Sequence, residues 1–208
     1  MLVEIWSDIV CPWCYIGKRR LETALSDFEH ADEVEIVWRS FQLDPSHPKG
    51  LIEPTQESLA RKFGSKQRIQ QAQAQVGQLA EAEGLHYDFE NAVSINTFDA
   101  HRLIHLATKH GKNAEAHERL MRANLVEAAT LDTDTLVKLA EELQVPADEA
   151  RQVLEGDAYT DEVNADIAQA RAYGASGVPF FVLDRKYGIS GAQSADVFRQ
   201  ALATAHAG

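Results

Sequence analysis

Ser7-Asp8-Ile9-Val10-Cys11-Pro12-Trp13-Cys14-Tyr15-Ile16-Gly17 contains both cysteines of this 208-residue chain. Leu2 to Asp8 has the apolar pattern of a short strand, and Ile16 to Phe28 carries apolar residues at helical spacing. The cysteine pair therefore lies where a strand gives way to a helix. The free N–H groups and the dipole of a helix start favour a thiolate, and a Cys-x-x-Cys pair there can close a disulfide within one turn. We predict a redox-active thiol pair.

Each residue of the motif has an expected role. Cys11 is the exposed attacking thiolate, and Cys14, one turn into the helix and more buried, resolves the mixed disulfide. Pro12 is tolerated because the first helical turn makes no use of its missing N–H. Trp13 is expected to be exposed, either as a flat apolar platform for a partner or closed over another part of the chain.

Two structural roles for the cysteine pair are less well supported by the sequence than a redox role. A disulfide that closes so short a loop removes little chain entropy from the unfolded state, so it stabilises poorly. A structural zinc ion needs four ligands, and no second cysteine pair or nearby Cys-His set completes one. His101 and His105 have the i, i+4 spacing of a two-histidine metal site but lack a third ligand. We predict no metal site and no required cofactor.

Two separated segments resemble those of a known family. Residues 7–17 resemble the active-site segment of DsbA-like thioredoxin-fold proteins, specifically the FrnE-like branch of cytosolic dithiol oxidoreductases. Gly177-Val178-Pro179-Phe180-Phe181-Val182 resembles the segment that presents a cis-proline to the cysteines in such proteins. The match continues at Asn96-Thr97, Ala100-His101-Arg102 and Ser190-Gly191-Ala192-Gln193. The resemblance implies a thioredoxin-like fold and thiol–disulfide exchange.

Pro179 stands near the start of a strongly apolar strand, Val178 to Leu183, and prolines in sheets are confined to strand starts or edges. On its own it would be read as a trans proline, since only about 5 to 6% of X–Pro bonds are cis. The resemblance implies instead a cis bond that turns the backbone of Val178 toward the cysteine helix, where an extended substrate could pair with it. Val178 and Pro179 are therefore predicted substrate-side residues.

Three further features are candidates for tuning the pair. Asp8, if buried, could relay a proton to or from the resolving thiol; the alternative is an aspartate of the strand-end turn. Asn96 is expected, with Thr97, to cap the next helix, and the resemblance implies that it also approaches the cysteines and touches substrate. The basic run Lys18-Arg19-Arg20 could favour an anionic thiol such as glutathione, or be a solvated helix face.

The order of patterns along the chain predicts an α/β fold of the thioredoxin-like type with an inserted all-helical domain. A β-α-β unit ends with strand Glu33 to Leu43, and the pattern is then helical from about Thr55 to Gly174. A strand hairpin and a last helix, capped by Ser194, close the chain. We expect a discontinuous thioredoxin-like domain, residues 1–44 and 175–208, and an inserted helical domain, residues 45–174, that includes a return helix, Tyr159 to Tyr173.

Composition limits the partners. The net charge of −12 disfavours nucleic acid and anionic membrane surfaces, and no apolar run approaches membrane length. The chain opens directly into a strand without a leader, and a reducing compartment suits a chain with only two cysteines, so we expect a cytoplasmic location. The expected partner is a protein or small-molecule disulfide or dithiol, with glutathione as the candidate thiol co-substrate. Phe180 and Phe181 could be core or interface, which leaves a homodimer open.

Two other functional classes stay open. The split architecture resembles that of 2-hydroxychromene-2-carboxylate isomerases and kappa-class glutathione transferases, glutathione-dependent enzymes that have a serine where this chain has Cys11. The other class is a peptide-binding, chaperone-like module in which the thiols are incidental. Two thiols in one motif favour redox chemistry, and its net direction depends on the redox potential of the pair.

Overall fold

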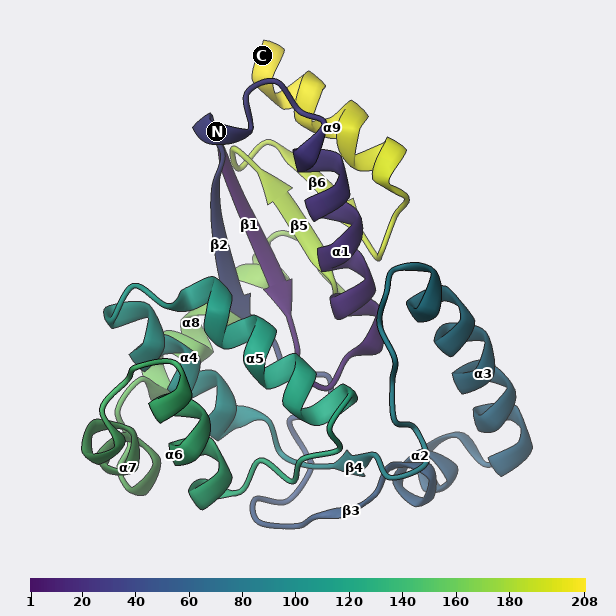
Figure 1. The fold of residues 1–208 in the computed structure, drawn as a ribbon, viewed down its shortest axis with the longest axis vertical. Coiled ribbons are helices and arrows are strands. Elements are labelled where there is room, and N and C mark those ends of the chain that lie inside the picture. The colour runs from purple at the N-terminus through teal and green to yellow at the C-terminus, as the bar shows by residue number, and fades with distance from the viewer.

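A four-stranded sheet with the order β2-β1-β5-β6 forms one end of the molecule (Figure 1). The computed structural model describes all 208 residues. β1 (Leu2–Ser7) and β2 (Glu35–Ser40) are parallel, and α1 (Pro12–Ser26) connects them. β5 (Phe180–Leu183) pairs antiparallel with both β1 and β6 (Tyr187–Ser190). The predicted β-α-β unit and C-terminal hairpin are confirmed.

η1 (Ala31–Glu33) precedes β2, and α9 (Ala195–Ala207) follows β6. The insert lies between β2 and β5 and comprises β3 (Glu53–Pro54), α2 (Thr55–Phe63), α3 (Lys66–Ala82), β4 (Val93–Ser94), α4 (Phe98–Lys109), α5 (Asn113–Leu125), α6 (Thr133–Glu142), α7 (Ala147–Glu155) and α8 (Thr160–Ala172). In Figure 1, α2 and α3 lie to one side of the lower end of α1, and α4 to α8 lie to the other.

The structure departs from the sequence prediction at two element boundaries and in one helix cap. β2 stops at Ser40 because its neighbour β1 ends at Ser7, whose carbonyl accepts a last bond from Phe41 N. β5 begins only at Phe180, after a proline that has no N–H to give to the sheet. The side chain of Ser194 precedes α9 but makes no capping bond.

The insert is not purely helical, because β3 and β4 pair antiparallel as a small second sheet. Each of these strands has only two residues, too few to show the alternating pattern by which a strand is recognised. The pairing joins the segment before α2 to the segment before α4, and thereby connects the two helical parts of the insert.

The side chains of β1 alternate between two apolar faces of the sheet. Val3 and Ile5 pack under α1 and α9, whereas Trp6 packs on the opposite face against α8. The indole Nε1 of Trp6 donates to the carbonyl of Asp166 in α8 at 2.8 Å. The predicted return helix therefore does pack on the sheet.

Two apolar clusters make up most of the interior. The insert core contains 26 buried residues, mostly from α4 to α7, and includes five residues of the segment 9–16, both cysteines among them. The sheet core contains 11 buried residues and includes Leu21 and Ala24 from the second half of α1. Helix α1 thus begins in one core and ends in the other. None of the helices has the length and apolar character needed to cross a bilayer.

Candidate active site

The cysteine pair occupies the first turn of α1. Cys11 is the N-cap residue, with an extended backbone (φ −89°, ψ 111°), and Pro12 is the first helical residue. The backbone N–H of Cys11 donates to Asp8 O, and that of Cys14 donates to Cys11 O, each at 3.0 Å. Both cysteines are free thiols. The expected strand-to-helix junction therefore presents both thiols at one helix start.

Cys11 is not exposed, contrary to the prediction. Only 3% of Cys11 is accessible, against 0% of Cys14, so the predicted order of burial is right but the open attacking thiol is wrong. The physical reason is that Cys11 Sγ turns toward the carbonyl of Val178, to which it donates a hydrogen bond of 3.7 Å, while its side chain joins the insert core. Trp13 is the exposed side chain of the motif, with 38% of its surface accessible, as predicted.

The peptide bond between Val178 and Pro179 is cis, which confirms the expectation drawn from the resemblance. Helix α1 approaches the proline ring closely at Gly17. A Cβ atom added at Gly17 would lie 3.1 Å from Pro179 Cγ and 3.2 Å from Phe181 Cζ. A glycine at this position therefore allows α1 to lie against the start of β5, which holds the cysteines close to Val178.

The Cys14 thiol is in an environment that opposes ionisation. Burial raises the pKa of Cys14 well above its ordinary value, and the neighbouring Cys11 raises it further. The neighbouring Ser7 side chain and Asp8 backbone act in the opposite direction but do not outweigh burial. Cys14 is therefore a thiol at neutral pH, and it must lose its proton before it can act as a nucleophile.

Asp8 joins the cysteine loop to the insert. It is buried, its Oδ1 lies 3.2 Å from Nε2 of His101, and its Oδ2 accepts a hydrogen bond of 2.8 Å from Leu43 N. His101 is fully buried, and its Nδ1 has no hydrogen-bond partner. The turn role considered for Asp8 is also present, since its carbonyl accepts from Cys11 N. A buried carboxyl–imidazole pair thus lies at the base of the loop.

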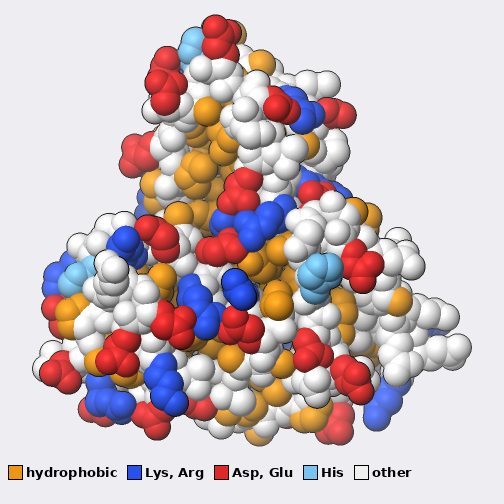
Figure 2. All heavy atoms as spheres, viewed as in Figure 1, with side chains coloured by type: hydrophobic (Ala, Val, Ile, Leu, Met, Phe, Trp, Pro, Cys, Tyr) orange, Lys and Arg blue, Asp and Glu red, His pale blue; other side chains and the backbone are white.

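The basic run Lys18-Arg19-Arg20 is paired within the molecule. Lys18 and Arg19 contact Glu118 of α5 at 2.8 and 2.5 Å, and Arg20 contacts Glu83 at 2.7 Å. Figure 2 shows acidic and basic side chains side by side at the middle of this face, where α1 meets the insert. Burial alone would raise the pKa of Glu118, but hydrogen bonds from α1, first that of Arg19, lower it to about 2. The run is neither an unpaired cationic patch nor a solvated face.

An apolar groove opens beside Pro12. Asp8, Val10 and Pro12 line a pocket of about 250 Å³ with residues of α2 and α3, and a second pocket of about 450 Å³ adjoins it between these two helices. The hydroxyl of Tyr87 donates to Pro12 O at 2.7 Å, and burial raises the pKa of Tyr87, so it stays a donor. The residues common to both pockets are Pro12, Leu59, Gln73 and Phe89.

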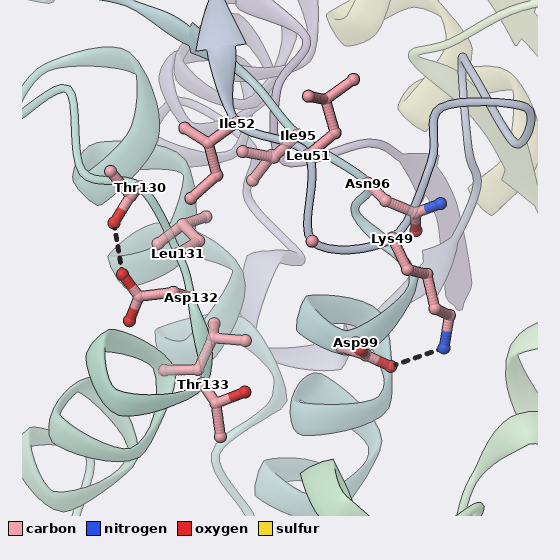
Figure 3. Close-up of a pocket in the computed structure, with 12 residues that line it drawn as sticks. Lys49, Leu51, Ile52, Ile95, Asn96, Asp99, Thr130, Leu131, Asp132 and Thr133 are labelled. Carbon is pink, nitrogen blue, oxygen red and sulfur yellow. Dashed lines mark hydrogen bonds and ion pairs between the residues drawn. The ribbon is translucent and has the colours of Figure 1, made fainter.

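A separate hollow of about 160 Å³, shown in Figure 3, is lined by neither cysteine. Lys49 and Asp99 form an ion pair of 3.2 Å there. Asn96 also lines it: its Oδ1 accepts from Phe98 N at 2.9 Å, as predicted for the start of α4, whereas the N-cap residue Thr97 makes no side-chain capping bond. The Nδ2 of Asn96 donates to His47 O at 2.6 Å. The structure thus shows Asn96 fastening a loop to α4, and its contact with substrate stays a prediction.

The family of the chain follows from its match to known proteins. The family model of the DSBA-like thioredoxin domain matches residues 2–203. The chain belongs to this family.

Individual relatives agree with that assignment. A crystal structure of a probable DsbA oxidoreductase from Streptomyces coelicolor is 47% identical, with a TM-score of 0.96, and the match covers 100% of this chain and 90% of that one. The uncharacterized protein YwbO of Bacillus subtilis is 30% identical over 203 residues, 96% of this chain and 94% of that protein. A 2-hydroxychromene-2-carboxylate isomerase shares the fold at 16% identity, with a TM-score of 0.76 over 98% of this chain and 95% of that one.

Sequence reasoning missed the contacts of four residues: His101, His105, Tyr87 and Glu118. His101 and His105 share a spacing but not a partner, because His105 Nε2 lies 3.2 Å from both Ser40 Oγ and Asp166 Oδ2. The apolar residues that flank His101 in α4 were a usable signal for its burial. Tyr87 and Glu118 contact α1 from segments distant in sequence, and no local sequence pattern predicts such contacts.

Proposed function

We propose that this protein is a thiol–disulfide oxidoreductase that works through the Cys11–Cys14 pair and a mixed disulfide. The observation that carries the proposal is the juxtaposition of Cys11 Sγ with the Val178 carbonyl, 3.7 Å away, at a helix start that also holds Cys14. Membership of the DSBA-like family and the likeness to the Streptomyces protein support it. Assignment to the FrnE-like branch, on residues 7–17, and a cytoplasmic location belong to the same proposal.

The exchange consists of two balanced displacements. The Cys11 thiolate attacks one sulfur of a substrate disulfide, the substrate S–S bond breaks, and the second substrate sulfur leaves as a thiolate. The Cys14 thiolate then attacks Cys11 sulfur, forms the Cys11–Cys14 bond and releases the first substrate sulfur. Two electrons pass from the pair to the substrate, and another dithiol must reduce the pair again. The same steps in reverse oxidise a dithiol substrate.

The substrate side of the site comprises Pro12, Trp13, Val178 and Pro179. An extended substrate would pair with the Val178 backbone and place apolar side chains in the groove beside Pro12. Because Cys11 is only 3% exposed, the loop has to open before a substrate reaches its sulfur. The exposed Trp13 offers an apolar surface beside that opening.

Asp8 and His101 would receive the Cys14 proton. The pKa of Cys14 is raised by burial, so resolution needs a base. The Asp8 backbone acts to lower that pKa, and the Asp8 carboxyl faces His101. We expect Asp8→Asn and His101→Gln to slow resolution at least about tenfold and to move its pH profile upward. His105→Gln is the control from the same helix. Equal pH profiles in all three variants would exclude the relay.

The main test is reduction of the interchain disulfides of insulin, run beside two cysteine variants. Cys11→Ser should lose exchange, whereas Cys14→Ser should accumulate a mixed disulfide visible by mass spectrometry. The absence of any two-electron interconversion of the wild-type pair across a series of thiol buffers would overturn the proposal. The midpoint of that series and the pH dependence of Cys11 alkylation together give the net direction.

The fold likeness to 2-hydroxychromene-2-carboxylate isomerase supports one alternative. In that case glutathione is a co-substrate, and the chain isomerises or conjugates a small molecule. The two free thiols in one motif favour disulfide exchange over this alternative. If Cys14→Ser traps no mixed disulfide and glutathione-dependent turnover of a chromene carboxylate appears, the isomerase class is the correct one.

A further inference from the structure

Three potential metal ligands meet at the end of the sheet that lies away from the insert. They are His30, just before η1, Glu33 within η1, and His206 in the last turn of α9, and their ligand atoms all lie within 4.8 Å of one another. Both chain termini lie at this end (Figure 1), and histidine and acidic side chains are adjacent on its surface (Figure 2). The three residues come from segments far apart in sequence, so no spacing motif predicts the cluster.

The geometry suits one small divalent ion. Ligand atoms about 2.0 to 2.1 Å from a tetrahedral zinc ion lie roughly 3.3 Å apart. His30 Nδ1 and Glu33 Oε1 are already 3.2 Å apart. The two imidazole rings are stacked, with centroids 3.9 Å apart and planes 18° apart. Because the lone pair of a ligand nitrogen lies in its ring plane, the exposed His206 ring has to rotate out of this stack before its nitrogen points at the same centre.

The backbone that carries these ligands is held in place. Phe28 packs edge-on against both imidazole rings, with centroids 5.8 and 5.9 Å away. The N-terminal ammonium of Met1 donates to Glu33 O at 2.8 Å. Helix α9, which carries His206, is anchored in the sheet core. The donors therefore come from fixed segments, and only side-chain torsions remain to be ordered on binding.

We propose that His30, Glu33 and His206 bind a divalent transition-metal ion of the zinc type, with water as the fourth ligand. Two imidazoles and one carboxylate with an open fourth position are a ligand set that zinc accepts. Binding connects α9 to the segment before β2 and so stabilises the sheet end of the molecule. Because a proton competes with the metal ion for each imidazole nitrogen, affinity falls as the pH is lowered.

The test uses the full chain with Cys11→Ser and Cys14→Ser, free of any histidine tag, because thiolates also bind zinc. Titration with zinc chloride should show one bound ion per chain and, at about a hundredfold excess over Kd, a rise in Tm of roughly 5 to 10 °C. Cobalt(II) in its place should give visible d–d bands without a sulfur-to-metal charge-transfer band. His30→Ala and His206→Ala should each weaken binding at least about tenfold.

His110→Ala is the matched control, because His110 also faces a carboxylate, Glu149 at 3.0 Å, but has no third ligand. Each variant is compared with its own metal-free Tm, so a small loss of stability does not obscure the shift. The proposal would be overturned if zinc still raised the Tm of the His206→Ala variant. It would also be overturned if zinc did not raise the Tm of the double cysteine variant. Since that variant lacks both thiols, the outcome is independent of the proposed redox function.

Discussion

The two cores of the molecule differ in what they do to the cysteines. The sheet core, 11 buried residues, carries the second half of α1 and holds no thiol. The insert core, 26 buried residues, contains Cys11 and Cys14, although in sequence both belong to the β-α-β unit. The active-site helix is therefore supported at one end by the sheet and at the other by the insert.

This difference indicates that the insert is part of the proposed redox site. It buries the thiols, supplies His101 opposite Asp8, and supplies Glu118 opposite Lys18 and Arg19. Burial in the insert core raises the pKa of Cys14. The helices that bury Cys14 belong to a segment that the sequence predicts only as a separate domain. Changes in the insert core should consequently alter thiol chemistry, while equal changes in the sheet core should alter only stability.

The largest expected effects come from truncating one leucine in each core. Leu120 of α5 and Leu202 of α9 are both fully buried, so Leu120→Ala and Leu202→Ala should each lower the free energy of unfolding by about 2 to 5 kcal/mol. Only Leu120→Ala should raise the rate of Cys11 alkylation several-fold, measured well below both Tm values. Equal alkylation rates in the two variants would show that the insert core does not control access to the thiol.

Two helical glycines give a smaller and sharper comparison. Gly17→Ala and Gly77→Ala gain the same helix propensity, about 1 kcal/mol. At Gly77 the new Cβ would meet only Phe89 at 3.7 Å, so that variant should be stabilised. At Gly17 the contacts of 3.1 and 3.2 Å with Pro179 and Phe181 add an overpacking cost of about 1 to 3 kcal/mol.

The measurement is urea unfolding together with the insulin assay. Gly17→Ala should be less stable than wild type and slower in exchange, because α1 must move away from the segment that carries Val178. A Gly17→Ala variant that is stabilised as much as Gly77→Ala would contradict the proposed close fit of α1 to β5.

The sequence predicts the fold and the chemical pair well because both rest on local signals. The change of period at residues 7–17 places Cys11 and Cys14 at a helix start, and the resemblance correctly anticipates the cis bond before Pro179. Exposure of Cys11 is predicted wrongly because it depends on contacts between distant segments, with Val178 and with the insert core. Local pattern locates the thiols, and tertiary packing determines how they are reached.

The smallest expected effect concerns the ion pairs between α5 and α1. The pKa of Glu118 is lowered from 4.5 to about 2, so its ionised form stabilises the fold above pH 4.5, and that stabilisation is lost as the pH falls toward 2. Glu118→Gln should therefore cost on the order of 1 to 2 kcal/mol at pH 7, after allowance for solvent screening, and should flatten the pH dependence of unfolding in that window. Glu142→Gln is the control, because Glu142 of α6 pairs at 2.6 Å with Arg119, the neighbour of Glu118 in α5, and not with a residue of α1. Denaturant unfolding between pH 2 and 7, with alkylation rates at pH 7, separates the two. If both variants change the acid slope equally, the ion pairs act as ordinary surface charges, and the link between the insert and the cysteine helix rests on apolar packing alone.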